Sequence, residues 1–390
     1  MAGAGGYTAA VDGRREELLA FLRRIASMES PTLEKARVDT VIDVFDAAYR
    51  ELGFATRRLA QTQYGDHLVA DFAGGGGPRV VLVGHADTVY PLGTLTSMPV
   101  EVDGDRLRGP AVMDMKGGLT AGLFAVRCLL ERRRDLPGAI RVVINSDEEP
   151  GSPTSRDLWA ELTRGARCAF VLEPAQPDGG LVLRRKGVGI FRLHVRGRAA
   201  HAGVEPEKGA SAIRALARKF LDIEALAKPA IGTTANVGVI RGGTHPYVVP
   251  EEAEAVIDFR VATLAERDRV LAGLRAIVER EDVPATQGTL TGQFHRPPLE
   301  PVPSIDGFTA LIEEEARLLG QPVTWAPLNG GASDGNNIAA AGVPTIDGMG
   351  PAGGRAHSPD EYMEIPSLFQ KTALLAGVLD RLVGSEMRPR

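Results

Sequence analysis

The first part of the chain alternates helical patterns with short apolar runs. Two helical stretches lie within Glu16–Leu52, and a strongly apolar helix is predicted over Leu119–Arg134. The runs predicted as strands are His67–Phe72, Arg79–Val83, Ile140–Asn145 and Cys168–Leu172. Short apolar runs followed by helices are typical of buried parallel strands. The pattern therefore predicts an α/β domain with a doubly wound, mostly parallel sheet.

The character of the chain changes near Gly179. Leu181–Val195 alternates apolar and polar residues, as an antiparallel strand with one solvent-exposed face would. A helix, two strands and a second helix are then predicted over Ala210–Ala227, Thr233–Ile240, Ala253–Val261 and Ala265–Arg280. This β-α-β-β-α order predicts an inserted α+β domain of ferredoxin-like type with roughly 110 residues.

A cluster of prolines between Pro297 and Pro303 indicates a linker that returns the chain to the first domain. Helix–strand alternation then resumes over Ser304–Leu319, Val323, Asn336–Ala341, Thr345–Ile346 and Ser367–Val383. We therefore predict a main domain formed by residues 1–180 and 297–390, with an insert at 181–296.

Composition excludes some classes of function. The 45 basic and 50 acidic residues give a net charge of −5, without the basic footprint of a nucleic-acid-binding protein. The N-terminus has no apolar run of the signal-peptide type, and no later run approaches the roughly 20 apolar residues of a membrane helix, so we expect neither, and no membrane partner. Cys128 and Cys168 lie in apolar contexts without paired spacing. Buried free thiols and a reducing, cytoplasmic compartment are the expectation.

Candidate metal ligands follow the predicted strands, where loops at the carboxyl ends of a parallel sheet converge. His85 follows the run Arg79–Val83, and Asp87 is suitably spaced to fix its imidazole tautomer. A loop histidine beside a capping aspartate is the alternative. Glu173 places another carboxylate at the end of the Cys168–Leu172 run.

Three further segments carry similar side chains. Asp114 precedes the apolar helix, and taken alone it is better interpreted as an N-cap. Asp147, Glu148 and Glu149 directly follow a buried strand, and clustering three acids there is costly unless cations compensate them. A solvated acidic loop is the alternative. His357 lies on a glycine-rich loop near the C-terminus.

Taken together, these segments supply two histidines and several carboxylates. Such a set suits Zn²⁺ better than Mg²⁺, which prefers oxygen ligands and water. Two metal ions need one bridging carboxylate and a nearby general base, and the set contains candidates for every role. A serine or cysteine hydrolase is disfavoured because the Gly-x-Ser-x-Gly match, Gly331-Ala332-Ser333-Asp334-Gly335, does not directly follow a predicted strand, as a nucleophile elbow would.

The motifs resemble, in order and in sequence, the aminoacylase/carboxypeptidase G family of di-zinc metallopeptidases. The matching motifs are His85-Ala-Asp87, Asp114-Met-Lys-Gly-Gly, Asp147-Glu148-Glu149, Glu173-Pro and His357-Ser-Pro-Asp-Glu-Tyr. The stretches Gly331-Ala-Ser-Asp334-Gly-Asn-Asn and Asp347-Gly-Met-Gly-Pro-Ala-Gly-Gly-Arg-Ala-His357 look most like the glutamate carboxypeptidase branch.

The resemblance implies a role for each residue. Asp114 bridges two zinc ions per subunit, with a cis peptide to Met115, and Co²⁺ or Mn²⁺ are conceivable substitutes. His85 and Glu173 complete one site. Glu149 and His357 complete the other. Glu148 is the general base and later the acid on the shared water, and Asp87 orients His85.

The resemblance also extends to the insert, which matches a dimerisation or lid domain. It implies a homodimer in which His201 reaches the active site of the other subunit and polarises the scissile carbonyl. Arg260 would grip the carboxylate of the substrate, a task that suits the planar guanidinium. Asn236 is a candidate for a neighbouring polar contact. Without the resemblance, the alternative for Arg260 is a place on the solvent-exposed face of a strand. The alternative for His201 is a structural histidine at the surface.

Two positions depart from the family pattern. Ala111 stands where a glycine is frequent, which we interpret as a packing detail. Tyr247 stands in the insert where an asparagine is usual, and this difference bears on substrate specificity.

The leading hypothesis is a di-zinc hydrolase that cleaves a peptide or N-acyl amide bond next to a free carboxylate, as a glutamate carboxypeptidase does. An N-acyl amino acid deacylase or an aminopeptidase of small peptides is the close alternative. A non-hydrolytic biosynthetic or binding member of the same fold is a more remote one.

Overall fold

The chain divides into two compact units. The computed structural model describes residues 5–76, 79–321 and 323–384. One unit runs to Leu183 and resumes over Pro301–Pro327 and from Ser333. The other comprises Arg184–Glu300 and the short segment Leu328–Ala332, which sequence reasoning had placed in the returning part of the main domain.

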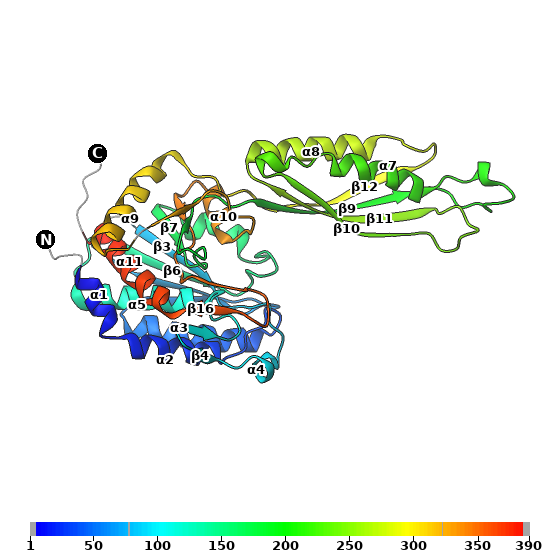
Figure 1. Ribbon diagram of the computed structural model, residues 1–390. Helices are drawn as coiled ribbons and strands as arrows, with labels where there is room; N and C mark the ends of the chain where they lie inside the picture. Colours follow the sequence, from blue (N-terminus) through cyan, green and yellow to red (C-terminus); the bar gives the residue numbers. More distant parts are fainter. Residues whose placement is uncertain (1–4, 77–78, 322, 385–390) are drawn as a thin grey trace. The chain divides into compact units, whose positions relative to one another are not determined.

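A six-stranded sheet in the order β1-β2-β6-β3-β7-β14 forms the centre of the first unit (Figure 1). Its strands are β1 (Ala55–Leu59), β2 (His67–Phe72), β3 (Arg79–His85), β6 (Ala139–Asn145), β7 (Ala166–Val171) and β14 (Thr345–Ile346). Strands β6, β3, β7 and β14 run parallel to one another. Only β2, next to one edge, runs in the opposite direction: it pairs antiparallel with both β1 and β6. The predicted mostly parallel sheet is confirmed.

Helices cover both faces of this sheet. Val80 and Leu82 of β3 belong to a core shared with α1 (Gly5–Asp12), α2 (Arg15–Ala26), α3 (Lys35–Glu51), α5 (Lys116–Arg132), α9 (Asp306–Leu318) and α11 (Ile365–Val383). Val81 and Val83 point to the opposite side and pack with α6 (Trp159–Leu162) and α10 (Asp334–Ala340). Because neighbouring side chains of a strand point to opposite faces, continuous β-branched runs become buried on both sides. The sheet is doubly wound.

Helix α2 illustrates how local sequence forms these elements. Leu18, Leu22 and Ile25 are fully buried at helical spacing, so one stripe of the helix faces the core. Two glutamates in its first turn and two arginines in its last turn complement the helix dipole.

Strand order determines where a site can form. The chain leaves β3, returns through α5 to β6 on one side, and then crosses to β7 on the other side. The loops after these three parallel strands therefore leave the same edge of the sheet, at a point where the strand order reverses. Ligand sites in open α/β sheets form at such points.

The second unit has the order β9 (Gly187–Arg196), α7 (Ala212–Glu224), β10 (Thr234–Gly242), β11 (Glu252–Val261), α8 (Leu264–Glu279) and β12 (Gln287–Arg296). Its sheet is antiparallel throughout, in the order β10-β11-β9-β12, which is the ferredoxin-like arrangement. Phe191 and Phe259 pack on the face covered by α7 and α8 (Figure 1). The opposite face carries Arg192, Asp258 and Arg260.

Sequence reasoning missed β12 and joined two strands into one. In β12, the positions that face the helices include Gly288 and Gly292, so the apolar alternation is too weak to predict a strand. The predicted strand Leu181–Val195 is instead β8 (Leu181–Val182), which pairs with β13 (Trp325–Ala326), and β9.

Short elements that pattern analysis did not predict complete the first unit. Besides β1 and α6, they include α4 (Thr94–Ser97) and a small sheet of β4 (Glu101–Asp103), β5 (Arg106–Arg108), β15 (Gly353–Gly354) and β16 (Tyr362–Glu364). The loop between β15 and β16 carries His357, so this sheet positions a predicted ligand.

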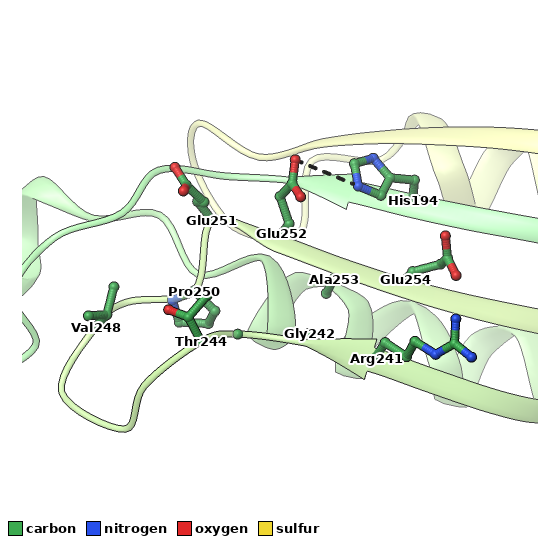
Figure 2. Close-up of a pocket in the computed structure, with 11 residues that line it drawn as sticks. His194, Arg241, Gly242, Thr244, Val248, Pro250, Glu251, Glu252, Ala253 and Glu254 are labelled. Carbon is green, nitrogen blue, oxygen red and sulfur yellow. Dashed lines mark ion pairs between the residues drawn. The ribbon is translucent and has the colours of Figure 1, made fainter.

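A cavity of about 370 Å³ lies on the second unit, at the ends of β9, β10 and β11 (Figure 2). Its lining includes Arg241, Glu254 and His194, whose Nε2 atom lies 4.0 Å from Oε1 of Glu252. None of the predicted site residues lines this cavity.

Candidate active site

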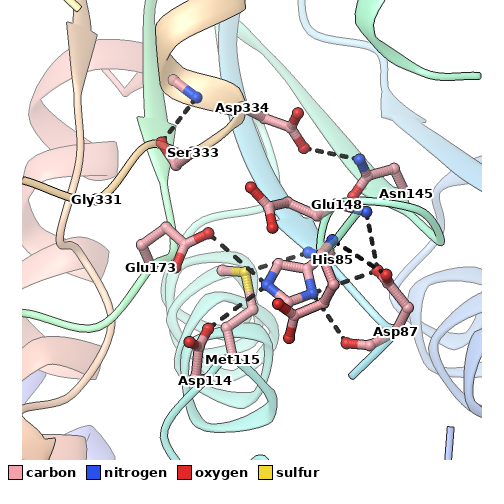
Figure 3. A network of polar contacts seen from close by, with 12 residues as sticks. His85, Asp87, Asp114, Met115, Asn145, Glu148, Glu173, Gly331, Ser333 and Asp334 are labelled. Atoms are coloured by element: carbon pink, nitrogen blue, oxygen red, sulfur yellow. Dashed lines mark hydrogen bonds and ion pairs between the residues drawn. The ribbon is translucent and has the colours of Figure 1, made fainter. Parts of the chain in front are cut away.

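His85 is buried at the carboxyl end of β3, and its surroundings fix the imidazole tautomer. Its Nδ1 atom lies 3.0 Å from the backbone carbonyl oxygen of Asp87. Since a carbonyl can only accept, Nδ1 carries the proton and Nε2 keeps a free lone pair. Nε2 lies 3.5 Å from Oδ1 of Asp114 and 3.7 Å from Oε1 of Glu173 (Figure 3). The nitrogen that can bind a metal faces two carboxylates.

Asp114 lies between two groups of candidate metal ligands, His85 with Glu173 and His357 with Glu149. Its second oxygen, Oδ2, is 3.2 Å from Nε2 of His357, and that nitrogen is 3.3 Å from Oε2 of Glu149. One oxygen of Asp114 thus faces His85, which also lies beside Glu173, whereas the other faces His357, which also lies beside Glu149. The peptide bond between Asp114 and Met115 is cis, as expected.

These distances fit cation binding. Ligands held about 2.0–2.1 Å from a tetrahedral zinc ion lie about 3.3 Å from one another. The separations of 3.2–3.7 Å around Asp114 are close to that value. In addition, donor atoms of His85, Glu148 and Glu173 all lie within 4.8 Å of one another.

The pKa shifts of the buried carboxyl groups also indicate a cation site. Burial, and then the charge of Asp114, raises the pKa of Glu173 well above its ordinary value. Burial also raises the pKa of Glu149. Burial acts in the same sense on Asp114, but the neighbouring imidazoles of His357 and His85, in their protonated form, outweigh it and lower the pKa of that carboxyl group. Buried carboxylates packed this closely are stable as anions when cations neutralise them.

One atom of Glu149 provides a separate test of the fit. Its Oε1 is buried and, among the described residues, has no hydrogen-bond partner. A buried carboxylate oxygen without a partner is costly, and a metal ion is one group that satisfies it. The residues present therefore fit a cation at this place.

The Asp87 carboxylate also contacts segments other than His85. It accepts backbone hydrogen bonds from Glu148 (3.1 Å) and Glu149 (3.2 Å), and one from the Thr32 hydroxyl (2.8 Å). Its Oδ1 atom lies 3.4 Å from Nδ1 of His85. One buried aspartate thus ties the end of β3 to the loop that follows β6.

The third acid of the cluster, Asp147, has a structural environment. Its carboxylate accepts hydrogen bonds from the backbone and side chain of both Thr154 and Ser155. Asn145 spans the same region and donates to Asp334 at 2.7 Å. Asp334, which sequence reasoning left without a role, also accepts from Ser152 and Trp159. These buried bonds shape the loop that carries Glu148 and Glu149.

Comparison with known proteins gives the family. Residues 81–381 match peptidase family M20/M25/M40. The chain belongs to this family. Carboxypeptidase G2 of Pseudomonas sp. strain RS-16 is 27% identical over 381 residues, which cover 96% of this chain and 91% of that protein. A succinyl-diaminopimelate desuccinylase of Gluconacetobacter diazotrophicus is 29% identical over 370 residues, 88% of this chain and 92% of the relative.

Solved structures agree on the fold. The aminopeptidase PepT of Bacillus cereus superposes with a TM-score of 0.81 at 22% identity, over 94% of this chain and 98% of that one. As a member of the M20/M25/M40 family, the chain is a metal-dependent metallopeptidase-type hydrolase.

The other predicted residues of this M20 chain lie in the second unit. The Arg260 guanidinium forms a two-point ion pair with Asp258, from Nε at 2.9 Å and Nη2 at 3.0 Å. Asn236 of β10 is the register partner of Asp258 on β11, and Thr234 that of Arg260. All four residues therefore share one face of the sheet.

His201 lies in an exposed loop and has a defined tautomer. Its Nδ1 atom accepts backbone hydrogen bonds from Gly203 and Val204, both at 3.2 Å. With Nδ1 accepting, the proton of the neutral ring is at Nε2, which makes Nε2 a donor.

The two departures from the family pattern have different explanations. Ala111 has φ of 56°, in the left-handed region that favours glycine, so this difference concerns backbone conformation rather than packing. Tyr247 is 58% exposed and its ring stacks on that of His245, with centroids 5.2 Å apart.

Among the described residues, no helix has the length and apolar character needed to cross a bilayer.

Proposed function

We propose that the chain is a two-zinc carboxypeptidase-like hydrolase, which cleaves a peptide or N-acyl amide bond next to a free carboxylate, with a glutamate-like amino acid as the leaving group. The observation that carries the proposal is the placement of Asp114, whose two oxygens face two different histidines, each of which also lies beside a second carboxylate.

The proposed roles of the first-unit residues follow from this placement. His85 and Glu173 would hold one zinc ion, Glu149 and His357 would hold the other, and Asp114 would be the ligand shared by both. When bound, the two cations polarise an amide carbonyl and make a water molecule more nucleophilic at neutral pH.

Glu148 carries the proton in the proposed mechanism. One of its carboxylate oxygens accepts a proton from the attacking water and later returns it to the leaving amide nitrogen. The water oxygen forms the new bond to the carbonyl carbon, the C–N bond breaks, and an acid and an amine result. Asp87 supports this by holding the backbone of Glu148 and Glu149 beside His85.

Two second-unit residues are proposed to act on the substrate. Asp258 occupies the Nε/Nη2 edge of Arg260, and among the described residues no hydrogen bond reaches Nη1. The Nη1/Nη2 edge therefore suits a substrate carboxylate, and Asn236 offers a polar contact on the same face. The Nε2 donor of His201 suits a developing oxyanion.

A homodimer formed through the second unit and a reducing, cytoplasmic compartment complete the proposal. The exposed edge strand β10 supports the dimer, because an unpaired strand edge is a template for another chain. The buried free thiols of Cys128 and Cys168 support the reducing compartment.

The substrate proposal can be tested with matched pairs of substrates. N-acyl glutamates and the same compounds with the α-carboxyl group amidated should differ in kcat/KM by about 10- to 100-fold, the worth of a charged hydrogen-bonded contact. Arg260→Gln should abolish the difference by slowing only the free-acid substrate. Arg192→Gln, on the same sheet face, is the matched control. Equal cleavage of both forms by the wild-type enzyme would sink the proposal.

The same measurements separate the alternatives. Cleavage of dipeptides that requires a free α-amino group would favour an aminopeptidase, and broad cleavage of N-acyl amino acids would favour a deacylase. The desuccinylase relatives give the deacylase alternative specific support. A protein that binds zinc but hydrolyses no member of the panel would fit the non-hydrolytic alternative.

A further inference from the structure

Glu361 is a fully buried carboxylate beside the proposed metal site, and it binds the backbone of the bridging segment. Its Oε1 atom accepts hydrogen bonds from the backbone N–H groups of Met113 (2.9 Å) and Asp114 (3.1 Å). These groups lie 248 and 247 positions away along the chain. A single oxygen thus holds the main chain at the residue whose carboxylate faces both donor pairs.

Tyr90 completes this arrangement from a third segment. Its hydroxyl lies 2.5 Å from Oε2 of Glu361 and 3.0 Å from the backbone carbonyl oxygen of Ser358. Ser358 directly follows His357. The phenol has one proton, so Tyr90 donates to Glu361 or to Ser358 at any one time. Glu361 itself lies four residues after His357, directly before β16, so its bonds to Met113 and Asp114 join the loop carrying His357 to the segment carrying Asp114.

Burial of the Glu361 carboxylate has a free-energy cost, so we expect its hydrogen bonds to have a role that an apolar side chain could not fill. Burying a carboxylate is unfavourable, and each of its oxygens here is matched by donors from a different segment. An apolar side chain of the same length would fill the space without that cost. What it would lose is the fixed distance between the Asp114 backbone and the His357 loop.

We propose that Glu361 is a positioning residue that, together with Tyr90, fixes the Asp114 carboxylate between its two pairs of donors and so sets the affinity of the site for metal ions. This inference rests on the proposed function, because it takes Asp114 as the bridging ligand. Glu361 acts through backbone hydrogen bonds and contacts neither substrate nor metal.

A matched pair of variants tests the proposal. Glu361→Met keeps length and volume but removes both acceptors, so the affinity for Zn²⁺ should fall by about 10- to 100-fold, as is usual when a partner of a metal ligand is lost. Glu361→Gln retains a carbonyl oxygen for Met113 and Asp114, and its amide can donate to Tyr90. Its affinity should stay within about threefold of wild type.

Tyr90→Phe leaves the bonds to Met113 and Asp114 in place, so its loss should be smaller than that of Glu361→Met yet measurable. The metal-free proteins would be titrated with Zn²⁺ in competition with a chromophoric chelator, with thermal unfolding recorded alongside. Glu315→Gln, at a buried carboxylate of α9, is the control that should alter stability without altering zinc affinity.

The outcomes separate the two proposals. Wild-type zinc affinity in Glu361→Met would show a merely structural role and overturn the inference. If that variant does not fold, wild-type affinity in Tyr90→Phe overturns it instead. A wild-type protein that binds no zinc contradicts the proposed function itself, whereas a zinc-binding wild type with unchanged variants contradicts only the role of Glu361.

Discussion

The two neighbouring glutamates of the β6 loop have different surroundings although they share one anchor. The Asp87 carboxylate accepts hydrogen bonds from the backbone N–H groups of both Glu148 and Glu149. The Glu149 carboxylate then lies beside His357, whereas that of Glu148 lies near His85 and Glu173. A proposed ligand and a proposed base can therefore be adjacent in sequence, because consecutive side chains leave the backbone in different directions.

Replacing Glu148 separates proton transfer from metal binding. In Glu148→Gln we expect two zinc ions per chain, as in wild type, and a fall in kcat of at least about 100-fold, the usual contribution of a general base. Metal analysis of the purified protein and steady-state kinetics on the same sample measure both quantities.

Glu173→Gln is the appropriate comparison, since loss of a ligand should lower the metal content itself. If Glu148→Gln loses metal to the same extent, Glu148 is a ligand in the His85 group. If it keeps near-normal turnover, the general-base role is wrong.

Single residues also show which parts of the site can be predicted from the sequence and which cannot. The histidines and carboxylates at strand ends were predictable, because their type and their place after apolar runs are visible along the chain. The structural roles of Asp334 and Glu361 were not. Their partners are donors more than 170 positions away, and nothing local in the sequence identifies those partners.

At the scale of elements, hydrophobic pattern predicted most helices and strands but misplaced some of their ends. The helix predicted from Leu119 begins at Lys116, because Gly117 and Gly118 form its first turn rather than a preceding loop. A Cβ atom on Gly118 would lie 1.8 Å from the carbonyl oxygen of Leu172. The glycine permits close packing of α5 against the end of β7, and such contacts are absent from any local pattern.

Helix α11 carries a buried lysine whose titration should be visible in stability. Burial lowers the pKa of Lys371 from 10.5 to about 8, and its Nζ donates to the carbonyl oxygen of Gly179 at 2.7 Å. Between pH 8 and 10.5 the unfolded chain binds more protons, so the stability of the first unit rises with pH. Relative to Lys371→Met, wild type should gain on the order of 3 kcal/mol across this window.

Urea unfolding of both proteins at several pH values measures this difference. The contribution of Lys371 is fully present above pH 10.5 and is lost as the pH falls through 8, where the buried ammonium must be accommodated. Lys208→Met, at a lysine whose side chain is 63% exposed, is the control. A gap between wild type and Lys371→Met that does not change with pH would contradict the prediction.

At the scale of the whole molecule, the second unit exposes a strand edge suited to a second copy. Strand β10 ends the sheet, contains no proline, and exposes Val239 and Ile240 to 41% and 55%. Ile213 and Leu221 of the neighbouring helix α7 are 43% and 67% exposed. A long, apolar edge of this kind is a liability in a monomer and an interface in a dimer.

The dimer proposal makes a prediction that a single subunit does not make. The family resemblance assigns His201 of each subunit to the active site of the other subunit. His201→Ala and Glu148→Gln should each be nearly inactive. Coexpressed, half of the dimers pair one subunit of each kind, and one of their two sites then contains both an intact Glu148 and an intact His201. Activity should therefore return to about a quarter of the wild-type value for a symmetric dimer. If His201 acts within its own subunit, no mixed dimer contains a complete site, and coexpression restores nothing.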